Sequence, residues 1–246
     1  MAKASSARII GDGYCSQEHA ARRLHMKFDE HGLLPVVAQD HLSGVVRMVA
    51  YANERAVQLT LESGRATFWS RSRGELWEKG RTSGNGLAVH AVLVDCDADC
   101  LIYLVAPEGP SCHTGKPSCF FRRAVLDAGT VRLADDQVPE PTLLGRLEAV
   151  LEARRSATAK ASYAKSLYDG GPAKIGEKLV EEAGELARAV AGETDERVVS
   201  EAADVLFHVM VALRSRGIAF EPLLRELDRR AGTSGHDEKR SRSAAG

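Results

Sequence analysis

The densest group of chemically reactive side chains in the first half of the chain is the segment DCDAD, residues Asp95–Asp99. It follows a predicted strand, and if that strand continued, Asp95, Asp97 and Asp99 would point to one side and Cys96 to the other. Three close carboxylates repel one another unless a hard cation lies among them, and Mg²⁺ takes such oxygen ligands. The segment indicates a magnesium site; the alternative is a solvated turn rich in aspartate.

Two further cysteines, Cys112 and Cys119, lie downstream in the segment PSCHTGKPSCF. With Cys96 they supply three thiolates, the soft ligands that zinc prefers, and three protein ligands with one open position are typical of catalytic zinc. The alternative for each cysteine is a small buried hydrophobic residue, the interpretation that we give to Cys15 and Cys100. Cys96, Cys112 and Cys119 are therefore candidate zinc ligands.

Polar side chains near these motifs are candidates for contacts with a substrate. His113 is a candidate catalytic residue, and a zinc ligand, a proton shuttle and a polar loop residue all fit its position. A predicted hairpin upstream of DCDAD carries hydrogen-bond donors suited to phosphates and riboses. The candidate substrate-binding residues of this half are Arg71, Arg73, Lys79, Thr82 and Ser83. Their alternative is a basic hairpin surface without a ligand.

In the second half, the segment KIGEKLVEEAGELARAV places lysines and carboxylates on one stripe of a predicted helix. The next predicted helix presents two more carboxylates and His208 at helical spacing. A short connection makes the helices antiparallel neighbours, so their acidic faces can meet in a groove that binds Mg²⁺ and phosphates. The candidate catalytic residues are Glu181, Glu182, Glu185, Glu201 and Asp204, and the candidate substrate contacts are Lys174 and Lys178. The alternative is an ordinary exposed charged face.

Short strands must position the candidate metal ligands and substrate contacts of the first half. Runs typical of strands, bounded by turn signals, lie at 34–39, 45–51, 66–70, 75–79, 87–94 and 101–105. A helix is expected after the second run, with Asn53 as its N-cap and Gly64 at its end. This half predicts an α+β domain dominated by a mostly antiparallel sheet.

Helices must position the candidate carboxylates and lysines of the second half. Apolar residues recur at helical spacing from Leu144, which predicts a first helix. They recur again over 175–190, which predicts a second helix with Pro172 in its first turn and Gly192 at its end. A last short helix is expected after Pro222. The intervening helix is expected to bury Val198, Ala202, Val205, Val209 and Leu213. This half predicts an all-α helical bundle. We expect an N-terminal extension at 1–27, a first domain at 28–123, a linker at 124–141, a second domain at 142–230 and a polar tail at 231–246.

Composition narrows the class of protein. In 246 residues, 33 Lys and Arg balance 34 Asp and Glu, which argues against a nucleic-acid partner because such proteins need a basic surplus. No apolar run reaches the ~18 residues that span a bilayer, and the first residues lack a secretory signal, so we expect no membrane partner and a cytoplasmic location. The odd number of cysteines, 5, disfavours a disulfide scaffold.

The run FWSRSRGELWEKGRTSGN at 68–85, followed by DCDAD and PSCHTGKPSCF, resembles phosphoribosyl-AMP cyclohydrolase of histidine biosynthesis over essentially the whole first domain. The resemblance implies that the three candidate cysteines bind zinc and the three aspartates bind magnesium. It also implies a homodimer whose zinc site is completed across the subunit interface. The implied reaction opens a purine ring: zinc lowers the pKa of a water that attacks C6 of an N1-substituted adenine, and the N1–C6 bond breaks. Ala98 departs from the glycine frequent in relatives, which affects turn geometry and not a ligand.

The segments EEAGE at 181–185 and EAAD at 201–204 resemble the EExxE…ExxD signature of all-α nucleotide pyrophosphohydrolases. The wider stretch beginning SYAKSLYDGG resembles the phosphoribosyl-ATP pyrophosphohydrolase branch, and its fusion behind a cyclohydrolase favours two consecutive reactions on small nucleotides. Two alternatives stay open: a general nucleotide pyrophosphatase fused to a zinc purine hydrolase, and a non-catalytic protein with a closed structural zinc site.

Overall fold

The computed structural model describes residues 25–134, 140–156 and 162–231. The chain divides into two compact units, Met1–Val138 and Pro139–Gly246, the first built on a sheet and the second on helices. This confirms the expected α+β domain followed by a helical domain. The predicted N-terminal extension, apart from residues 25–27, and the predicted polar tail, apart from Ala231, lie outside the described residues, as does Cys15. Among the described residues, no helix combines the length and apolar character needed to span a bilayer.

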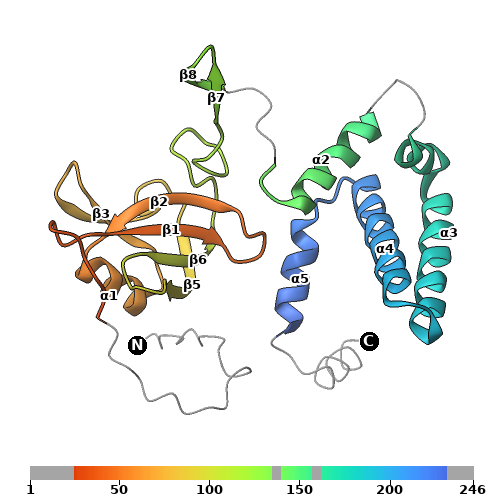
Figure 1. Cartoon of the computed structure of the whole chain (residues 1–246), viewed down its shortest axis with the longest axis horizontal. Coiled ribbons are helices and arrows are strands. Elements are labelled where there is room, and N and C mark those ends of the chain that lie inside the picture. The colour runs from red at the N-terminus through yellow and green to blue at the C-terminus, as the bar shows by residue number, and fades with distance from the viewer. Residues whose placement is uncertain (1–24, 135–139, 157–161, 232–246) are drawn as a thin grey trace. The chain divides into compact units, whose positions relative to one another are not determined.

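The first unit is organised around a six-stranded sheet (Figure 1). In chain order its strands are β1 (Leu34–Asp40), β2 (Val46–Ala52), β3 (Thr67–Ser70), β4 (Glu75–Glu78), β5 (Leu87–Val94) and β6 (Leu101–Pro107). Their spatial order is β4-β3-β2-β1-β6-β5, and only the β1–β6 pair is parallel. The sheet is therefore mostly antiparallel, as predicted, and β5 is one of its edge strands.

One helix, α1 (Glu54–Ser63), packs beside β3 and closes the core of this unit. The Asn53 side chain accepts a hydrogen bond from the Ala56 backbone N–H, and Gly64 ends the helix at a φ of 68°, a left-handed conformation that favours glycine. Both predicted caps are confirmed. Alternate residues of β1 enter the core, and Met26 and Phe28 pack against it, so ordered chain begins before β1.

The structure differs from the sequence analysis at residues 124–134, which we assigned to a linker. They belong to a hairpin of β7 (Arg123–Asp127) and β8 (Thr130–Ala134). Its two-residue turn, Ala128-Gly129, has φ angles of 45° and 80°, which suit a tight hairpin turn. The aspartates and prolines that indicated a linker lie beyond the hairpin in the sequence. The alternation of apolar and polar residues inside the hairpin covers only two short strands, which was too little to predict strands there.

The second unit contains α2 (Leu143–Ser156), α3 (Tyr163–Gly192), α4 (Asp195–Ser215) and α5 (Glu221–Ala231). α3 bends at Gly171, whose φ of 71° is non-helical, and Pro172 begins the straight part that follows, as predicted. A short connection makes α3 and α4 neighbours along their length (Figure 1). The core includes Leu151, Leu167, Met210 and Phe220.

The buried face of α4 differs from the prediction in part: Val198, Val205, Val209 and Leu213 are half-buried, but Ala202 is not. Ala202 is exposed, whereas the polar Glu201 and His208 are each only 2% exposed. The chemically reactive stripe of α4 packs toward α3, in keeping with the expected meeting of the two acidic faces. Burial of a carboxylate and an imidazole needs partners, and these partners define the site described below.

Candidate metal and substrate sites

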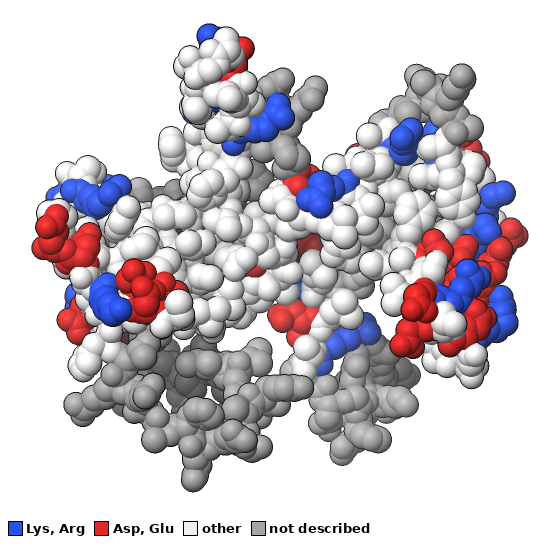
Figure 2. Space-filling view, viewed as in Figure 1, with Lys and Arg blue, Asp and Glu red and all other residues white. Residues whose placement is uncertain are grey.

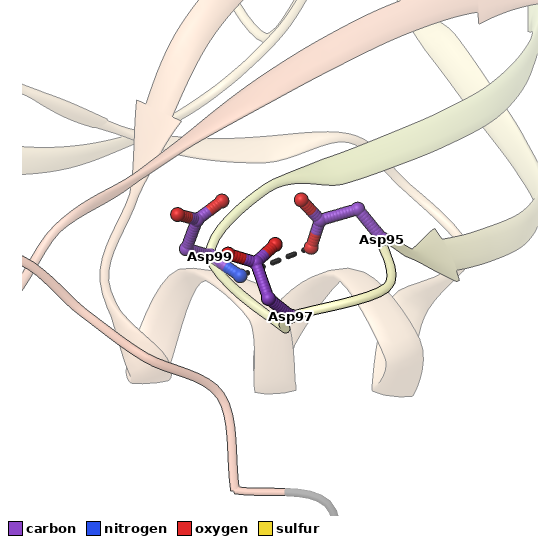
Figure 3. A group of neighbouring side chains, drawn as sticks. All are labelled: Asp95, Asp97 and Asp99. Atoms are coloured by element: carbon purple, nitrogen blue, oxygen red, sulfur yellow. Dashed lines mark hydrogen bonds between the residues drawn. The ribbon is translucent and has the colours of Figure 1, made fainter.

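The three aspartates of the first unit lie together in the loop between β5 and β6 (Figure 3). β5 ends at Val94, so the strand does not continue through DCDAD; the loop instead turns at Ala98, which has a φ of 66°. One carboxylate oxygen from each of Asp95, Asp97 and Asp99 lies within 4.8 Å of the others. The three carboxylates can therefore share a metal ion, although the loop and not strand alternation brings them together.

Hydrogen bonds hold the loop in this shape. The Asp95 Oδ1 atom accepts the backbone N–H groups of Asp99 and Cys100 at 3.0 and 3.1 Å. The pKa of Asp99 is raised mainly by charge repulsion from Asp97 and, to a smaller extent, by a hydrogen bond with Asp95. A bound cation would relieve this repulsion, which is the electrostatic condition of an acidic metal site. Lys27 lies beside the loop and donates its backbone N–H to the Ala98 carbonyl at 2.6 Å.

Cys112 and Cys119 meet in the loop after β6. The Thr114 hydroxyl donates a hydrogen bond to Cys112 Sγ at 3.1 Å and, with the Thr114 backbone, lowers the pKa of the Cys112 thiol. A hydrogen bond also links the two cysteines, while partial desolvation raises the pKa of Cys119. Lys79 lies beside both: burial lowers the pKa of its ammonium group, and charge on Cys119 and Cys112 acts in the opposite direction. This environment favours one thiolate and so suits a soft metal.

Cys96 lies apart from the other two cysteines within one chain. β5 ends at Val94, which pairs with Leu101 at the start of β6, whereas Cys112 follows the far end of β6 at Pro107. The 7 residues of β6 span about 20 Å. A single copy of the sheet therefore does not bring the three thiol groups to one ion.

A cavity of about 800 Å³ opens beside Cys112 and Cys119. Five predicted residues line it: Arg73, Lys79, Thr82, Ser83 and His113. Lys79 is 9% exposed and donates from Nζ to the Asn85 carbonyl at 2.8 Å, so its charge is held at the cavity wall. Arg71 is not part of the lining; its guanidinium stacks on the Tyr51 ring at 3.9 Å from the centroid. The cavity is large enough and basic enough for a phosphorylated nucleotide.

A buried ion pair that the sequence analysis missed anchors the cysteine loop to the sheet. Arg47 on β2 pairs with Asp40 on β1 at 2.5 Å and also donates to the Pro117 carbonyl at 3.3 Å. The Arg47 carbonyl accepts the Cys119 backbone N–H at 2.8 Å, and the Ser118 hydroxyl donates to the Val46 carbonyl at 2.7 Å. The position of Cys119 is thus tied to the β1–β2 pair.

Replacing Arg47 with Met is expected to lower the free energy of unfolding by about 3–5 kcal/mol, because it leaves the Asp40 carboxylate buried without its cation. Denaturant unfolding measures the change. The control is the double variant Asp40→Asn with Arg47→Met, which removes both charges and should lose less stability than the single variant. Equal losses in the two proteins would contradict a role for this pair in holding the loop.

In the second unit, Glu182 on α3 meets Glu201 and Asp204 on α4, with one oxygen of each within 4.8 Å of the others. Arg197 pairs with Glu201 Oε1 at 2.8 Å, but the buried Glu201 Oε2 atom has no hydrogen-bond partner. Desolvation raises the pKa of Glu201, opposed by Arg197. A buried carboxylate oxygen without a partner is costly unless a cation binds it, so this cluster fits a divalent metal.

The other predicted residues of this half surround the cluster. Glu185 contacts Arg188 and Arg197 at 3.5 and 3.6 Å, and Glu181 accepts from Lys178 at 2.9 Å. Lys174 is exposed on the same helix, and acidic and basic side chains gather over α3 and α4 in Figure 2. Of the five predicted carboxylates, three can therefore share one ion, and two are occupied by basic neighbours.

Tyr163 and His208 extend the cluster. The His208 Nδ1–H donates to the Asp204 carbonyl at 2.8 Å, so Nε2 accepts from the Tyr163 hydroxyl, also at 2.8 Å. Desolvation raises the pKa of Tyr163, and the charges of Glu182 and Asp204 act in the same direction. The helical spacing placed His208 with Glu201 and Asp204 in the sequence analysis, but no local signal indicated Tyr163, which lies 45 residues from His208.

Comparisons with known proteins match a different family to each of the two units. The family model of phosphoribosyl-AMP cyclohydrolase matches residues 48–121, and that of phosphoribosyl-ATP pyrophosphohydrolase matches residues 144–231. A histidine biosynthesis bifunctional protein HisIE of Wolinella succinogenes is 41% identical over 87% of this chain and 95% of the relative. The protein of the same description from Deinococcus radiodurans is 42% identical over 85% of this chain and 94% of the relative. The one from Thermus thermophilus is 40% identical over 82% of this chain and 90% of the relative. The chain therefore belongs to the family of bifunctional histidine-biosynthesis hydrolases that join a phosphoribosyl-AMP cyclohydrolase to a phosphoribosyl-ATP pyrophosphohydrolase.

Proposed function

We propose that the acid cluster of the second unit releases pyrophosphate from phosphoribosyl-ATP and that the cysteine cavity of the first unit opens the ring of the resulting phosphoribosyl-AMP. The observation that carries the first assignment is the unpartnered, buried Glu201 Oε2 atom in a group of three carboxylates. The second assignment is supported by Cys112 and Cys119 at the wall of a basic cavity of nucleotide size.

In the second unit, we assign Mg²⁺ to Glu182, Glu201 and Asp204, because hard cations take carboxylate oxygens. When bound, Mg²⁺ supplies charge that stabilises the phosphates during cleavage of the anhydride. Lys178 and Lys174 are assigned to the phosphates, and Lys178 is already held near the acids by Glu181 at 2.9 Å. Glu181 and Glu185 hold basic neighbours at the rim of the cluster and complete the catalytic set.

In the first unit, we assign zinc to Cys96, Cys112 and Cys119 and Mg²⁺ to Asp95, Asp97 and Asp99. When bound, zinc supplies a Lewis acid that brings the pKa of a water toward neutrality. The substrate phosphates are assigned to the cationic and hydroxyl groups of the cavity wall, Arg73, Lys79, Thr82 and Ser83. We assign no substrate contact to Arg71, because its guanidinium stacks on the ring of Tyr51.

The reaction in this cavity is the addition of water to C6 of the substituted adenine. The C6–N1 bond then breaks, C6 keeps the water oxygen as the carbonyl of an amide, and the two protons of the water pass to N1 and to the exocyclic nitrogen on C6. His113 lines the cavity next to Cys112 and is the residue that we assign to this proton transfer. Its imidazole has the chemistry for the step at neutral pH.

The separation of Cys96 from the other two cysteines supports a homodimer. Because the two ends of β6 are about 20 Å apart, Cys96 of one protomer reaches the zinc only on a partner. Leu93 and Val94 before Cys96 and Phe120 after Cys119 are all exposed apolar residues, as expected beside an interface. We further propose a cytoplasmic location, because both substrates are charged nucleotides that do not cross membranes.

A product assay with the full-length protein and phosphoribosyl-ATP tests these assignments. Pyrophosphate release is expected to require Mg²⁺ and to survive a zinc-selective chelator, whereas ring opening stops with the chelator and returns when zinc is added. Deoxynucleoside triphosphates serve as control substrates for the second unit. Equal rates on these controls would contradict the phosphoribosyl-ATP assignment, and ring opening without zinc would contradict the cysteine site.

A further inference from the structure

The β7–β8 hairpin has one apolar face and one polar face. Directly opposed residues of an antiparallel pair point to the same side, and the pairs Ala124–Leu133 and Leu126–Val131 therefore share a face. The opposite face carries the pairs Arg123–Ala134, Val125–Arg132 and Asp127–Thr130. The hairpin thus has the binary pattern of a structure that packs one side against a partner.

In the part of the chain that the structure describes, the apolar face of the hairpin is largely exposed. Leu126, Val131 and Leu133 are 76%, 72% and 69% exposed, and few charged side chains interrupt the hairpin in Figure 2. A hairpin of two 5-residue strands is at best marginally stable in water without packing. An exposed apolar face on such an element indicates a surface that a partner covers.

We propose that this face docks on a second copy of the chain, against the end of β5 that precedes Cys96. The proposal rests on the zinc-bridged homodimer described above. The hairpin begins at Arg123, four residues after Cys119, and exposed Leu93 and Val94 lie within three residues of Cys96. When the partner's β5 end brings its own cysteine to the zinc, its exposed apolar pair arrives beside the start of the hairpin. The two uncovered apolar surfaces then cover each other.

β5 is an edge strand: Arg65 bridges its outer side near the start, at Ala88, and the end at Val94, which the arm would approach, pairs with Leu101 of β6. The arrangement is isologous, because each protomer offers one hairpin and one β5 end. The hairpin therefore acts as a dimerisation arm that holds the partner's thiolate at the zinc. It raises zinc affinity in the first unit without touching the metal or the substrate.

Site-specific photo-crosslinking identifies the occupant. A benzophenone amino acid at position 126 is placed in isotopically light chains, which are mixed with unmodified heavy chains and zinc before illumination. We expect crosslinks from position 126 of the light chain to the end of β5 of the heavy chain. The matched control places the same amino acid at position 130, on the polar face, and should crosslink weakly.

A pair of neighbouring substitutions measures the energetic effect. Val131→Lys puts a charge on the apolar face, and Thr130→Lys puts the same charge on the polar face opposite Asp127. We expect Val131→Lys to weaken zinc binding, measured by chelator competition, by about tenfold or more, and Thr130→Lys to leave it within about twofold. Pyrophosphate release should stay unchanged in both, because the substitutions lie in the first unit, and circular dichroism that matches the wild type shows that this unit has folded.

Three results would overturn the inference. Crosslinks within one light chain to the helical unit would mean that the hairpin covers its own chain. Equal zinc affinity for the two lysine variants in a zinc-bound dimer would reject the arm while leaving the proposed zinc site intact. A wild-type chain that binds zinc as a monomer would reject both the arm and the shared site.

Discussion

Replacing Cys112 with Ser is expected to abolish ring opening of phosphoribosyl-AMP while pyrophosphate release from phosphoribosyl-ATP continues. The Cys112 thiol is buried, and hydrogen bonds from Thr114 favour its thiolate form. Serine has the size of cysteine but is a hard, weakly acidic ligand that zinc binds poorly. The loss of rate should exceed the ~10–100-fold effect of removing an outer-shell partner of a metal. Separate assays of the two products check this result.

The matched control for this variant is Cys100→Ser. Cys100 is half-buried in the same unit, and its Sγ atom lies 3.9 Å from the Leu101 carbonyl, away from Cys112 and Cys119. It should keep both activities and its zinc content. Parallel loss of both activities in Cys112→Ser would contradict the assignment of this cysteine to the first reaction alone.

The amide variants Glu182→Gln and Asp204→Asn are expected to lower pyrophosphate release by about a hundredfold or more. Each keeps its size and removes one negative charge from the group of three carboxylates that can share an ion. Weaker Mg²⁺ binding removes charge stabilisation from the transition state, an effect of about 10²–10³ for comparable groups. Ring opening of supplied phosphoribosyl-AMP should be unchanged, because the cysteine cavity lies in the other unit.

The melting temperatures of the two amide variants and a control variant outside the cluster make the test of the acid cluster more specific. Without Mg²⁺, the melting temperature of both amide variants should hold or rise slightly, because one like-charge repulsion is removed. Glu177→Gln changes an exposed carboxylate on α3 outside the cluster and should leave pyrophosphate release unaffected. Near-normal pyrophosphate release in Glu182→Gln and Asp204→Asn would mean that the acids form only a solvated surface.

Local signals in the sequence determined the elements and their order. The caps of α1 at Asn53 and Gly64, the six strands of the sheet and the helical second half were all predicted, because capping, turn chemistry and periodicity act over a few residues. The motifs DCDAD and EEAGE…EAAD also placed the acidic groups of both units. For the Asp95–Asp99 loop this succeeded even though the strand ends earlier than the alternation argument supposed, since residues so close in sequence stay close in any turn.

The tertiary structure decided which of these residues meet. The rotation of α4 against α3 selects Glu182, Glu201 and Asp204 and brings His208 to Tyr163, 45 residues away, while Glu181 turns to Lys178. Strand pairing places Cys96 and Cys112 at opposite ends of β6. The Asp40–Arg47 pair, which anchors the Cys119 loop, and the exposed face of the β7–β8 hairpin also carry no local signature. Such contacts depend on side-chain packing between elements distant along the chain, and local periodicity does not encode how two packed elements are rotated or paired.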